Sequence, residues 1–436
     1  MDGFLIFLSL VVYLLLTFFR PVWGTYLILL LLPTYQIRFQ FFGLPTTFLE
    51  WMILLHALVT AVWLLKKNIK LPLKKIVLPL RWFIILAGAF ATAAFLSVFV
   101  APNTVKALGI FRAYILEALI FCVLLLVWIN TKERLYRCFL CLGALVGYLA
   151  IFGFFQYLTL FALPPSWWGP GAEPRRVVSL FSYPNAVSLL IGPVLAALTA
   201  LLVIKPQDHL VERHKKIIIF VLSLGIGLLV LTFSRGGWLG YTAATAFLLP
   251  FTKLKKTLLV LMAAAVVGSL MIPTFQERVL PALRGEDPAG QERLKLWAGA
   301  WEIIKIQPVL GTGLTGFREW YGALRTTNQD EILNYPHNFF LNFWVETGLL
   351  GLLAILGVFL WNFKTAAGMF TTRVSSRPLI LAALAGLVNI FVHGLVDAPF
   401  FKNDLALSFW FFLSIIPAAL LAENIKPNEE NKKLPT

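Results

Sequence analysis

The sequence predicts an all-α protein that crosses a membrane many times. Of its 436 residues, 59% are hydrophobic and 13% are charged, and the mean hydropathy is +0.82. Apolar runs long enough to cross a bilayer recur along the chain. The net charge of +16 is spread between these runs, which is typical of a topology signal. The pattern therefore indicates a lipid environment and no nucleic-acid partner.

The apolar runs give a count of about 12 or 13 transmembrane helices. The second run is short, and we expect it to form a hairpin with the first around Arg20 and Pro21. The first run lacks a basic flank and a small-residue cleavage site, so it reads as a retained helix. The runs cover residues 3–19, 22–33, 46–65, 79–100, 107–129, 135–161, 184–204, 216–233, 236–251, 256–273, 338–363, 378–396 and 404–422.

Basic loops alternate with the spans and predict the orientation. Residues 66–75, 130–137, 205–215, 252–256 and 364–377 carry lysines and arginines, which places them in the cytoplasm. Two long loops, 162–183 and 274–337, then face outside. The predicted regions are N-terminal spans in 1–273 (about ten), an outer loop with interfacial helices in 274–337, C-terminal spans in 338–422 and a cytoplasmic tail in 423–436.

The two sides also differ in their cations, because lysine predominates inside and arginine outside. Arginine presents a planar fork that binds phosphate oxygens in pairs. An outer face rich in arginine favours a site for a phosphate-bearing, lipid-linked ligand. Contact with ordinary lipid headgroups is the alternative for any single arginine.

The sequence Tyr335-Pro336-His337-Asn338 starts a membrane helix with a histidine. Proline suits a first helical turn, and the helix dipole is positive there. A neutral imidazole at the membrane surface is suited to act as a general base. The alternative is that His337 only caps the helix.

Three arginines lie at the outer ends of spans. Arg235 belongs to Ser-Arg-Gly-Gly-Trp-Leu-Gly between two spans, where a charge is unfavourable unless paired or functional, and the glycines would let a ligand approach the backbone. Arg175 and Arg176 precede the point where the outer loop re-enters the membrane, and Asn185 can cap that helix. Snorkelling to headgroups is the rival interpretation for Arg235.

Polar residues inside the spans give further candidates. Arg112 lies five residues before Glu117, a spacing that is poor for a direct pair, so we expect it to reach another helix. Asn338, Asn342 and Glu346 form one stripe, in which Glu346 is expected to pair with an arginine.

His393 and Asp397, four residues apart at the outer end of a later span, compete with His337 for the acid–base role. His337 is better placed, since it follows directly from the arginine-rich loop.

The long loop 274–337 has a helical pattern of its own. We predict an amphipathic helix that lies flat on the outer leaflet, then a short helix that carries Arg318. Packing against the bundle is the alternative. Arg293 lies off the predicted apolar stripe, which consists of Leu294, Trp297, Ala298, Trp301 and Ile304.

These motifs resemble the O-antigen ligase and polymerase superfamily between about residues 170 and 400. The usual Gly-Thr-Phe before the Pro-Asn pair is replaced here by Ser179-Leu180-Phe181. The matching positions are His337, Asn338, Gly348 and Gly351; Arg235 and Leu239; Arg176 with Pro184 and Asn185; and Arg293, Trp297, Pro308, Gly311 and Gly313.

The resemblance implies an inverting, metal-independent glycosyltransferase of the C superfamily that needs no cofactor. Its donor would be a glycan on undecaprenyl pyrophosphate at the outer face of the bacterial inner membrane, and its acceptor the lipid A-core of lipopolysaccharide. His337 would be the base. Arg235 and Arg176, with Arg293 or Arg318, would bind the pyrophosphate.

Other functions stay open at this point. A polysaccharide polymerase or a protein O-oligosaccharyltransferase would use the same chemistry on another acceptor. A lipid-linked oligosaccharide transporter would need ionisable groups near mid-membrane, and the candidates other than Glu346 lie at span ends. A cell-shape polymerase with a catalytic acid would rest on Asp397, or on Glu286 and Asp287.

Overall fold

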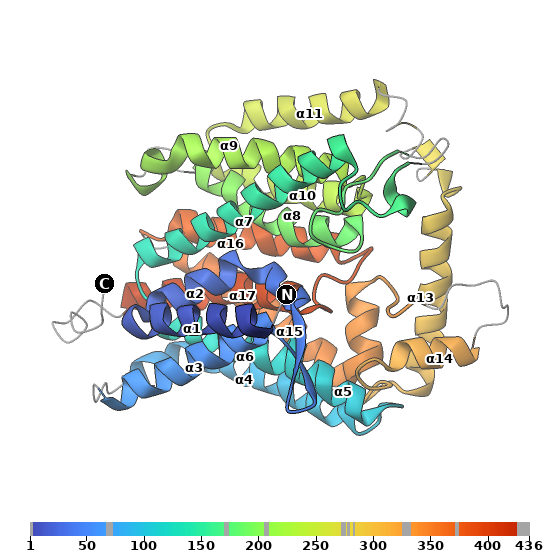
Figure 1. Cartoon of the computed structure of the whole chain (residues 1–436). Helices are drawn as coiled ribbons and strands as arrows, with labels where there is room; N and C mark the ends of the chain where they lie inside the picture. The colour runs from blue at the N-terminus through green and yellow to red at the C-terminus, as the bar shows by residue number, and fades with distance from the viewer. Residues whose placement is uncertain are drawn as a thin grey trace.

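The computed structural model is an α-helical bundle whose long helices run side by side (Figure 1). It describes residues 3–66, 73–169, 174–204, 209–271, 284–324, 333–370 and 375–424, together with 276, 280 and 281. The predicted tail therefore lies almost wholly outside the described residues.

A helix occupies every predicted apolar run. The elements in chain order are α1 (Gly3–Phe19), α2 (Pro21–Leu30), η1 (Leu32–Gln36), β1 (Arg38–Phe41), β2 (Leu44–Thr47), α3 (Phe48–Lys66), α4 (Leu73–Val98), α5 (Thr104–Ile110), η2 (Phe111–Leu116), α6 (Glu117–Trp128), α7 (Lys132–Thr159), η3 (Pro165–Trp167), α8 (Pro184–Ile204), α9 (His209–Leu231), α10 (Arg235–Leu248), η4 (Leu249–Phe251), α11 (Lys255–Met271), α13 (Pro288–Ile306), α14 (Gly316–Leu324), α15 (Phe339–Phe370), α16 (Arg377–His393) and α17 (Asn403–Asn424).

The helices identify a multi-pass membrane protein. Within the described ranges, eight segments are long and apolar enough to span a bilayer, and α1, α2 and α16 are shorter apolar helices. The hairpin of α1 and α2 turns at Arg20, as predicted. The strands β1 and β2 form one small antiparallel hairpin, in which Arg38 pairs with Thr47, beside the helices.

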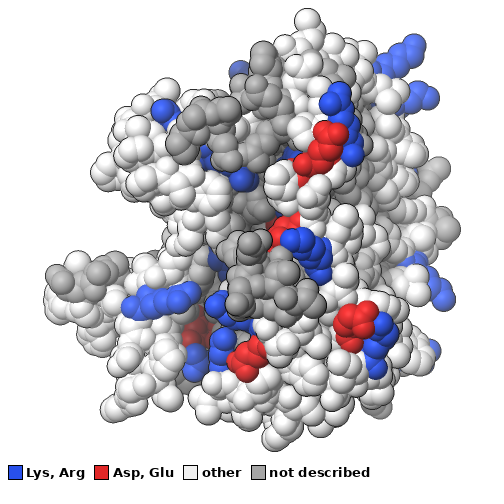
Figure 2. Space-filling model, turned by 90° about the vertical axis from the view of Figure 1, so that its right-hand side faces the viewer, with Lys and Arg blue, Asp and Glu red and all other residues white. Residues whose placement is uncertain are grey.

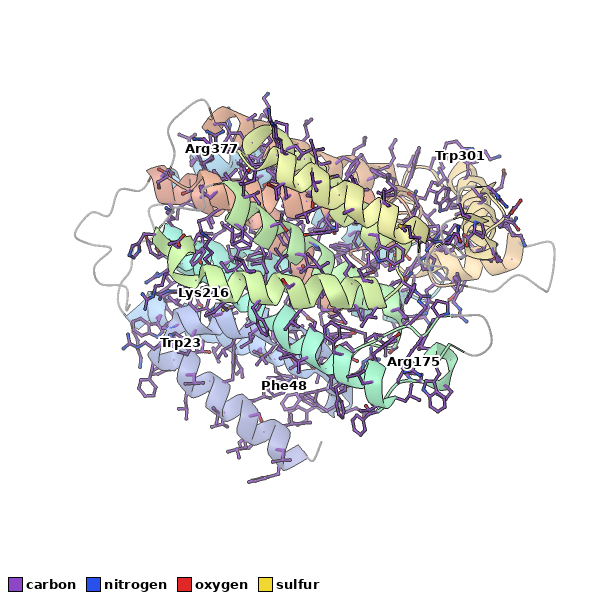
Figure 3. All side chains as sticks on the ribbon, turned by 90° about the horizontal axis from the view of Figure 1, so that it is seen from above. Trp23, Phe48, Arg175, Lys216, Trp301 and Arg377 are labelled. Carbon is purple, nitrogen blue, oxygen red and sulfur yellow. The ribbon has the colours of Figure 1, made fainter. Side chains whose placement is uncertain are left out.

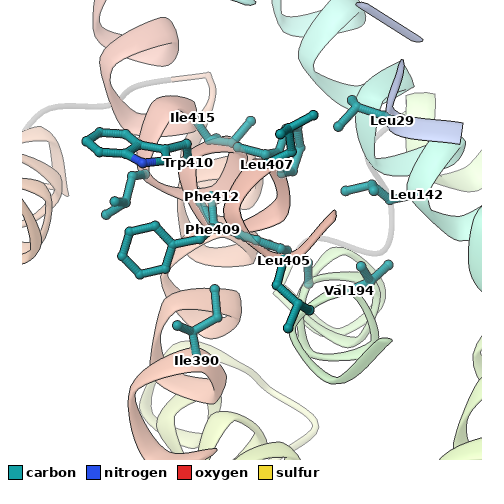
Figure 4. Packing of buried hydrophobic residues seen from close by; sticks show 14 of the residues in the cluster. Leu29, Leu142, Val194, Ile390, Leu405, Leu407, Phe409, Trp410, Phe412 and Ile415 are labelled. Carbon is teal, nitrogen blue, oxygen red and sulfur yellow. The ribbon is translucent and has the colours of Figure 1, made fainter. Parts of the chain in front are cut away.

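The centre of the bundle is formed by α8 and α17, which are buried along almost their whole length. Phe409, Trp410 and Phe412 of α17 belong to one cluster of buried apolar side chains that also includes Val194 of α8 and Ile390 of α16 (Figure 4). Lipid is as apolar as these side chains, so close van der Waals packing holds such helices together. This packing fixes the start of α8, the start of α15 and the end of α16 relative to one another.

The two ends of the bundle carry the loops that the sequence assigns to opposite sides. Lys216 and Arg377 lie at one end, while Arg175 and Trp301 lie at the other (Figure 3). The helices α13 and α14 belong to the second end, which we call the α13 end, and α13 runs across the ends of the spans (Figure 1).

The predicted apolar stripe of α13 is covered only in part, because Ile304 is buried and Trp297 is partly buried against the neighbouring helices. Leu294 and Trp301 are 61% and 49% exposed, whereas Leu296, Ala300 and Ile303 are buried against α14 and α15. Both sets recur at intervals of three or four residues, so the sequence pattern fits either face. Contact with the neighbouring helices decides which stripe is covered.

Helix α15 is broken at Gly348, where φ is 70° and ψ is 179°. The loop after α13 enters this break: the amide of Thr312 donates to the carbonyl of Val345 (2.6 Å), and the amide of Leu349 donates to that of Pro308 (3.1 Å). A Cβ on Gly348 would overlap the carbonyl of Val309. Gly348 thus lets the loop after α13 enter the middle of α15.

Candidate functional site

The chain places His337 in an unusual backbone conformation just before α15. Its φ is 50°, a value that non-glycine residues adopt rarely and mostly where the surroundings enforce it. The next residue, Asn338, caps the helix, because its Oδ1 accepts from the amides of Phe340 (3.0 Å) and Leu341 (3.1 Å). The capping role considered for His337 thus belongs to Asn338.

His337 forms a pair with Asp397. The His337 Nδ1 lies 2.9 Å from the Asp397 Oδ1, which also accepts from the amide of Ala398 (2.9 Å). Burial alone would raise the pKa of Asp397, but the hydrogen bond and charge of His337, with His393 and Arg293, hold that pKa below its usual range. An ionised carboxylate on Nδ1 fixes the ring and leaves Nε2 for a substrate.

Asn185 extends this pair to Arg176. The Asn185 Nδ2 donates to the Asp397 Oδ2 (3.1 Å), and its Oδ1 accepts from the Arg176 Nη2 (3.1 Å). Arg176, Asn185, Asp397 and His337 therefore form one hydrogen-bonded chain. Arg176 lies in the loop before α8, and Asn185 lies in the first turn of α8. Asp397 lies in the loop after α16, and His337 lies just before α15.

Arg176 is held by further contacts, and its neighbour Arg175 is held elsewhere. The Arg176 Nε donates to the carbonyl of Thr232 (2.9 Å), and its guanidinium lies 5.2 Å from the ring centre of Trp167. The guanidinium of Arg175 instead donates to the carbonyl of Tyr157 and lies over that ring. Arg176 therefore belongs to the site, while Arg175 anchors the loop to α7.

Arg235 begins α10 and is paired with an acid. Its Nη2 lies 2.7 Å from the Asp287 Oδ2, and Asp287 also caps α13. Burial alone would raise the pKa of Asp287. The hydrogen bond and charge of Arg235, the amide of Gly290 and the charge of Arg293 outweigh this effect, so that the pKa of Asp287 lies below its usual range. Arg293 also lowers the pKa of Asp397, so its charge acts on both acids.

The glycines after Arg235 serve helix packing, which corrects their predicted role in ligand approach. A Cβ on Gly236 would lie 2.7 Å from the Cδ2 of His393, and one on Gly240 would lie 3.1 Å from the Nδ2 of Asn389. Small residues here let α10 pack closely on α16. His393 is buried in this contact, and of the predicted pair only Asp397 bonds to His337.

Arg112 lies outside this network. It donates to the Glu50 Oε2 (3.2 Å) of α3 and to the carbonyl of Pro45 (2.9 Å). Its Nε also lies 3.8 Å from the Glu117 Oε1, although the spacing seemed poor for a pair. The segment η2 is a π-helix, whose wider turn brings residues five apart together.

Two further candidates also have structural contacts. Arg318 donates to the Asn334 Oδ1 (3.0 Å) and so steadies the segment that leads to His337. Glu346 is buried and accepts from the amide of Thr315. The expected arginine partner of Glu346 is absent among the described residues, since the loop in the α15 break supplies the donor.

Sequence reasoning missed the residues that hold the loop of Asp397. The hydroxyl of Tyr335 donates to the carbonyl of Phe401 (3.2 Å), and the Lys402 Nζ lies 4.4 Å from the ring centre of Phe181. Burial lowers the pKa of Lys402, and Asp404 offsets part of that change. Their closeness in sequence to His337 and Asp397 is the one available signal.

The α13 end gathers basic side chains around a hollow, with acidic side chains among them (Figure 2). In the described part of the chain, no group of three His, Cys, Asp or Glu residues is arranged to hold a metal ion. The guanidinium groups of Arg176 and Arg235 lie at this end.

The fold and the site together define a multi-pass membrane protein that presents an imidazole–carboxylate pair and fixed guanidinium groups at one end of its spans. Residues 218–356 match the model of the O-antigen ligase family. This segment contains Arg235, Arg293 and His337, so the similarity covers most of the motifs and confirms the resemblance seen in the sequence.

Two relatives show the same similarity at low identity. A Rickettsia felis protein named "Putative polysaccharide ligase" is 22% identical over 203 residues, which cover 43% of this chain and 47% of that protein. An uncharacterised protein of Haemophilus influenzae is 24% identical over 236 residues, which cover 48% of this chain and 58% of that protein. The chain thus spans about half the length of the relatives it matches.

Proposed function

We propose that this protein transfers a glycan from undecaprenyl pyrophosphate to an acceptor hydroxyl at the outer face of the bacterial inner membrane, with lipid A-core as the acceptor. The observation that carries the proposal is the hydrogen-bonded chain from Arg176 through Asn185 and Asp397 to His337. It links a candidate base to a phosphate-binding group. The arginine-rich α13 end and the basic loops opposite support the outward orientation.

In the proposed step, the Nε2 of His337 accepts the proton of the acceptor hydroxyl as its oxygen attacks the anomeric carbon. The bond from that carbon to the pyrophosphate oxygen breaks, and the electron pair leaves with the diphosphate, so the configuration inverts. Asp397 stabilises the imidazolium that forms. The leaving diphosphate is stabilised by Arg176 and Arg235, with Arg293 nearby.

The Asp287 carboxylate pairs with the guanidinium of Arg235, which is the group that would bind a phosphate of the donor. A phosphate accepts two parallel hydrogen bonds from a guanidinium, as a carboxylate does. Donor binding would then exchange Asp287 for the pyrophosphate on Arg235. The loss of the carboxylate contact is offset by the higher charge of the diphosphate.

The test is transfer from purified undecaprenyl-pyrophosphate glycan to separate acceptors, namely lipid A-core, a second glycan chain and a protein hydroxyl. We expect the wild type to modify lipid A-core and to stay active with a chelator. His337→Ala should lose about 10²- to 10⁴-fold in rate, and Arg235→Ala should also lose most transfer. His209→Gln, an exposed histidine in α9 at the opposite end, is the matched control.

Each contrary result has a defined meaning. Full activity of His337→Ala would remove the base from the proposal. Transfer only to a glycan or to a protein would identify the polymerase or the protein-glycosylating alternative. Movement of the donor across the bilayer without bond formation would favour a transporter.

A further inference from the structure

The end of the bundle opposite to His337 has a cavity between α2 and α7. Its volume is about 270 Å³. Trp23, one of its walls, lies at the same end as Lys216 and far from Arg175 and Trp301 (Figure 3). The residues that line it are Arg20, Val22, Trp23, Tyr26, Thr131, Glu133, Arg134 and Arg137.

The lining concentrates positive charge, because it contains three arginines and the N-terminus of a helix. Arg20 comes from the turn between α1 and α2, and Arg134 and Arg137 lie one turn apart at the start of α7. Like charges at this spacing repel each other. They also lie at a helix N-terminus, which is positive and favours acidic residues. Glu133 is the one acid among the described lining residues, so a bound anion would relieve this repulsion.

The cationic wall is held in place before any ligand binds. Thr131 caps α7 by accepting from the amide of Arg134 (3.2 Å). The Nη1 of Arg134 donates to the carbonyl of Trp128 (3.0 Å) and to the Asn130 Oδ1 (3.2 Å). The hydroxyl of Tyr26 reaches the carbonyl of Arg134, which joins the two helices across the cavity. A fixed wall lowers the ordering cost of binding.

The other wall is apolar and partly exposed. Val22 and Tyr26 are buried, and Trp23 is 53% exposed at the level where tryptophan commonly meets the membrane interface. The volume lies just below the roughly 300–1,000 Å³ of pockets that enclose a whole small ligand. It therefore suits a headgroup whose chains stay in the bilayer beside α2.

We propose that this cavity binds the phosphate headgroup of an anionic membrane lipid, in the leaflet opposite to the His337 site. Arginines and a helix N-terminus are the groups that recognise phosphate, and the apolar wall receives the start of the acyl chains. None of these residues belongs to the proposed transfer site, so this inference stands independently of it.

The experiment titrates the full chain in detergent with phosphatidylglycerol, phosphatidylcholine or inorganic phosphate, and measures bound lipid by native mass spectrometry and Tm. The wild type should bind phosphatidylglycerol more tightly than phosphatidylcholine, and inorganic phosphate should not displace it. Arg20→Gln with Arg137→Gln should bind phosphatidylglycerol roughly thirtyfold more weakly. Lys216→Gln, which removes a cation at the same end, should bind as the wild type does.

Arg137→Gln alone changes one exposed side chain and should weaken binding roughly fivefold, which covers the case in which the double variant fails to fold. Equal affinity of the wild type for the two lipids would overturn the proposal. Unchanged affinity in the arginine variants would do the same. Full displacement by inorganic phosphate would identify a free anion as the ligand and end the lipid assignment.

Discussion

Replacing Asp397 with asparagine changes the proposed site with almost no change in shape. Three donors point at the carboxylate: the Nδ1 of His337, the Nδ2 of Asn185 and the amide of Ala398. An asparagine has one acceptor oxygen, so its own amide group would face one of these donors. Turning Asn185 to accept would break its bond to Arg176.

The size of the effect follows from the charge that is lost. A hydrogen bond to a charged group contributes about 1.5–3 kcal/mol. The His337–Asp397 bond strengthens when the imidazole takes up the proton, so much of that contribution appears in the transition state. At about 1.4 kcal/mol for each tenfold change in rate, Asp397→Asn should lower kcat roughly 10- to 150-fold, while the KM for the donor changes little.

The assay is glycan transfer at saturating donor, with Tm measured in the same detergent to confirm folding. Glu302→Gln, an exposed acid of α13 that pairs with Lys305, should keep the rate of the wild type. A folded Asp397→Asn variant with a kcat within threefold of the wild type would refute the pairing as part of the mechanism. An effect confined to KM would give Asp397 a binding role only.

The remaining predictions concern stability and the donor. The pKa of Asp397 is lowered in the folded state, so its contribution to stability is present above the unfolded value of about 3.9 and is lost as the pH falls below that value. The Tm difference between the wild type and Asp397→Asn should therefore be present from pH 5 to 8 and shrink below pH 4. A difference that grows as the pH falls below 4 would contradict this sign. If Asp287 competes with the donor for Arg235, Asp287→Asn should lower the donor KM, whereas a KM raised severalfold would mean that Asp287 holds Arg235 in position. Gly348→Ala should lower the free energy of unfolding by about 2 kcal/mol or more, because the positive φ and the nearby carbonyl both oppose a side chain. Gly88→Ala is the control, because a Cβ there meets no atom within 4 Å, and it should leave Tm unchanged in the same thermal scan.

The positions of the spans could be predicted because a bilayer sets their length and composition. Helix α8 runs from Pro184 to Ile204, as predicted, since proline opens it and an uninterrupted apolar run follows. The rotation of α13 could not be predicted, because two of its faces are apolar and only the neighbouring helices decide between them. The break at Gly348 was also missed, as its cause is a loop that comes from another part of the chain.

The positions of the candidate site residues could be predicted, but the residues with which they pair could not. His337, Arg176 and Arg235 are candidates because the sequence predicts that they lie near the outer ends of spans, and the roles assigned to them stay predictions. Their partners are distant in sequence: Asp397 follows His337 by 60 residues and Asp287 follows Arg235 by 52. No periodicity relates such positions, so only the packed helices show which residues are in contact.

The loop that enters the α15 break has a consequence for how the protein can be divided. A helix interrupted at membrane depth leaves backbone groups that lipid cannot satisfy, and here Thr312 and Pro308 satisfy those of Val345 and Leu349. The segment around α13 and α14 is therefore an integral part of the membrane fold, although it lies outside the spans. Shortening or exchanging it would remove these partners, so the outer segment and the bundle must fold and vary together.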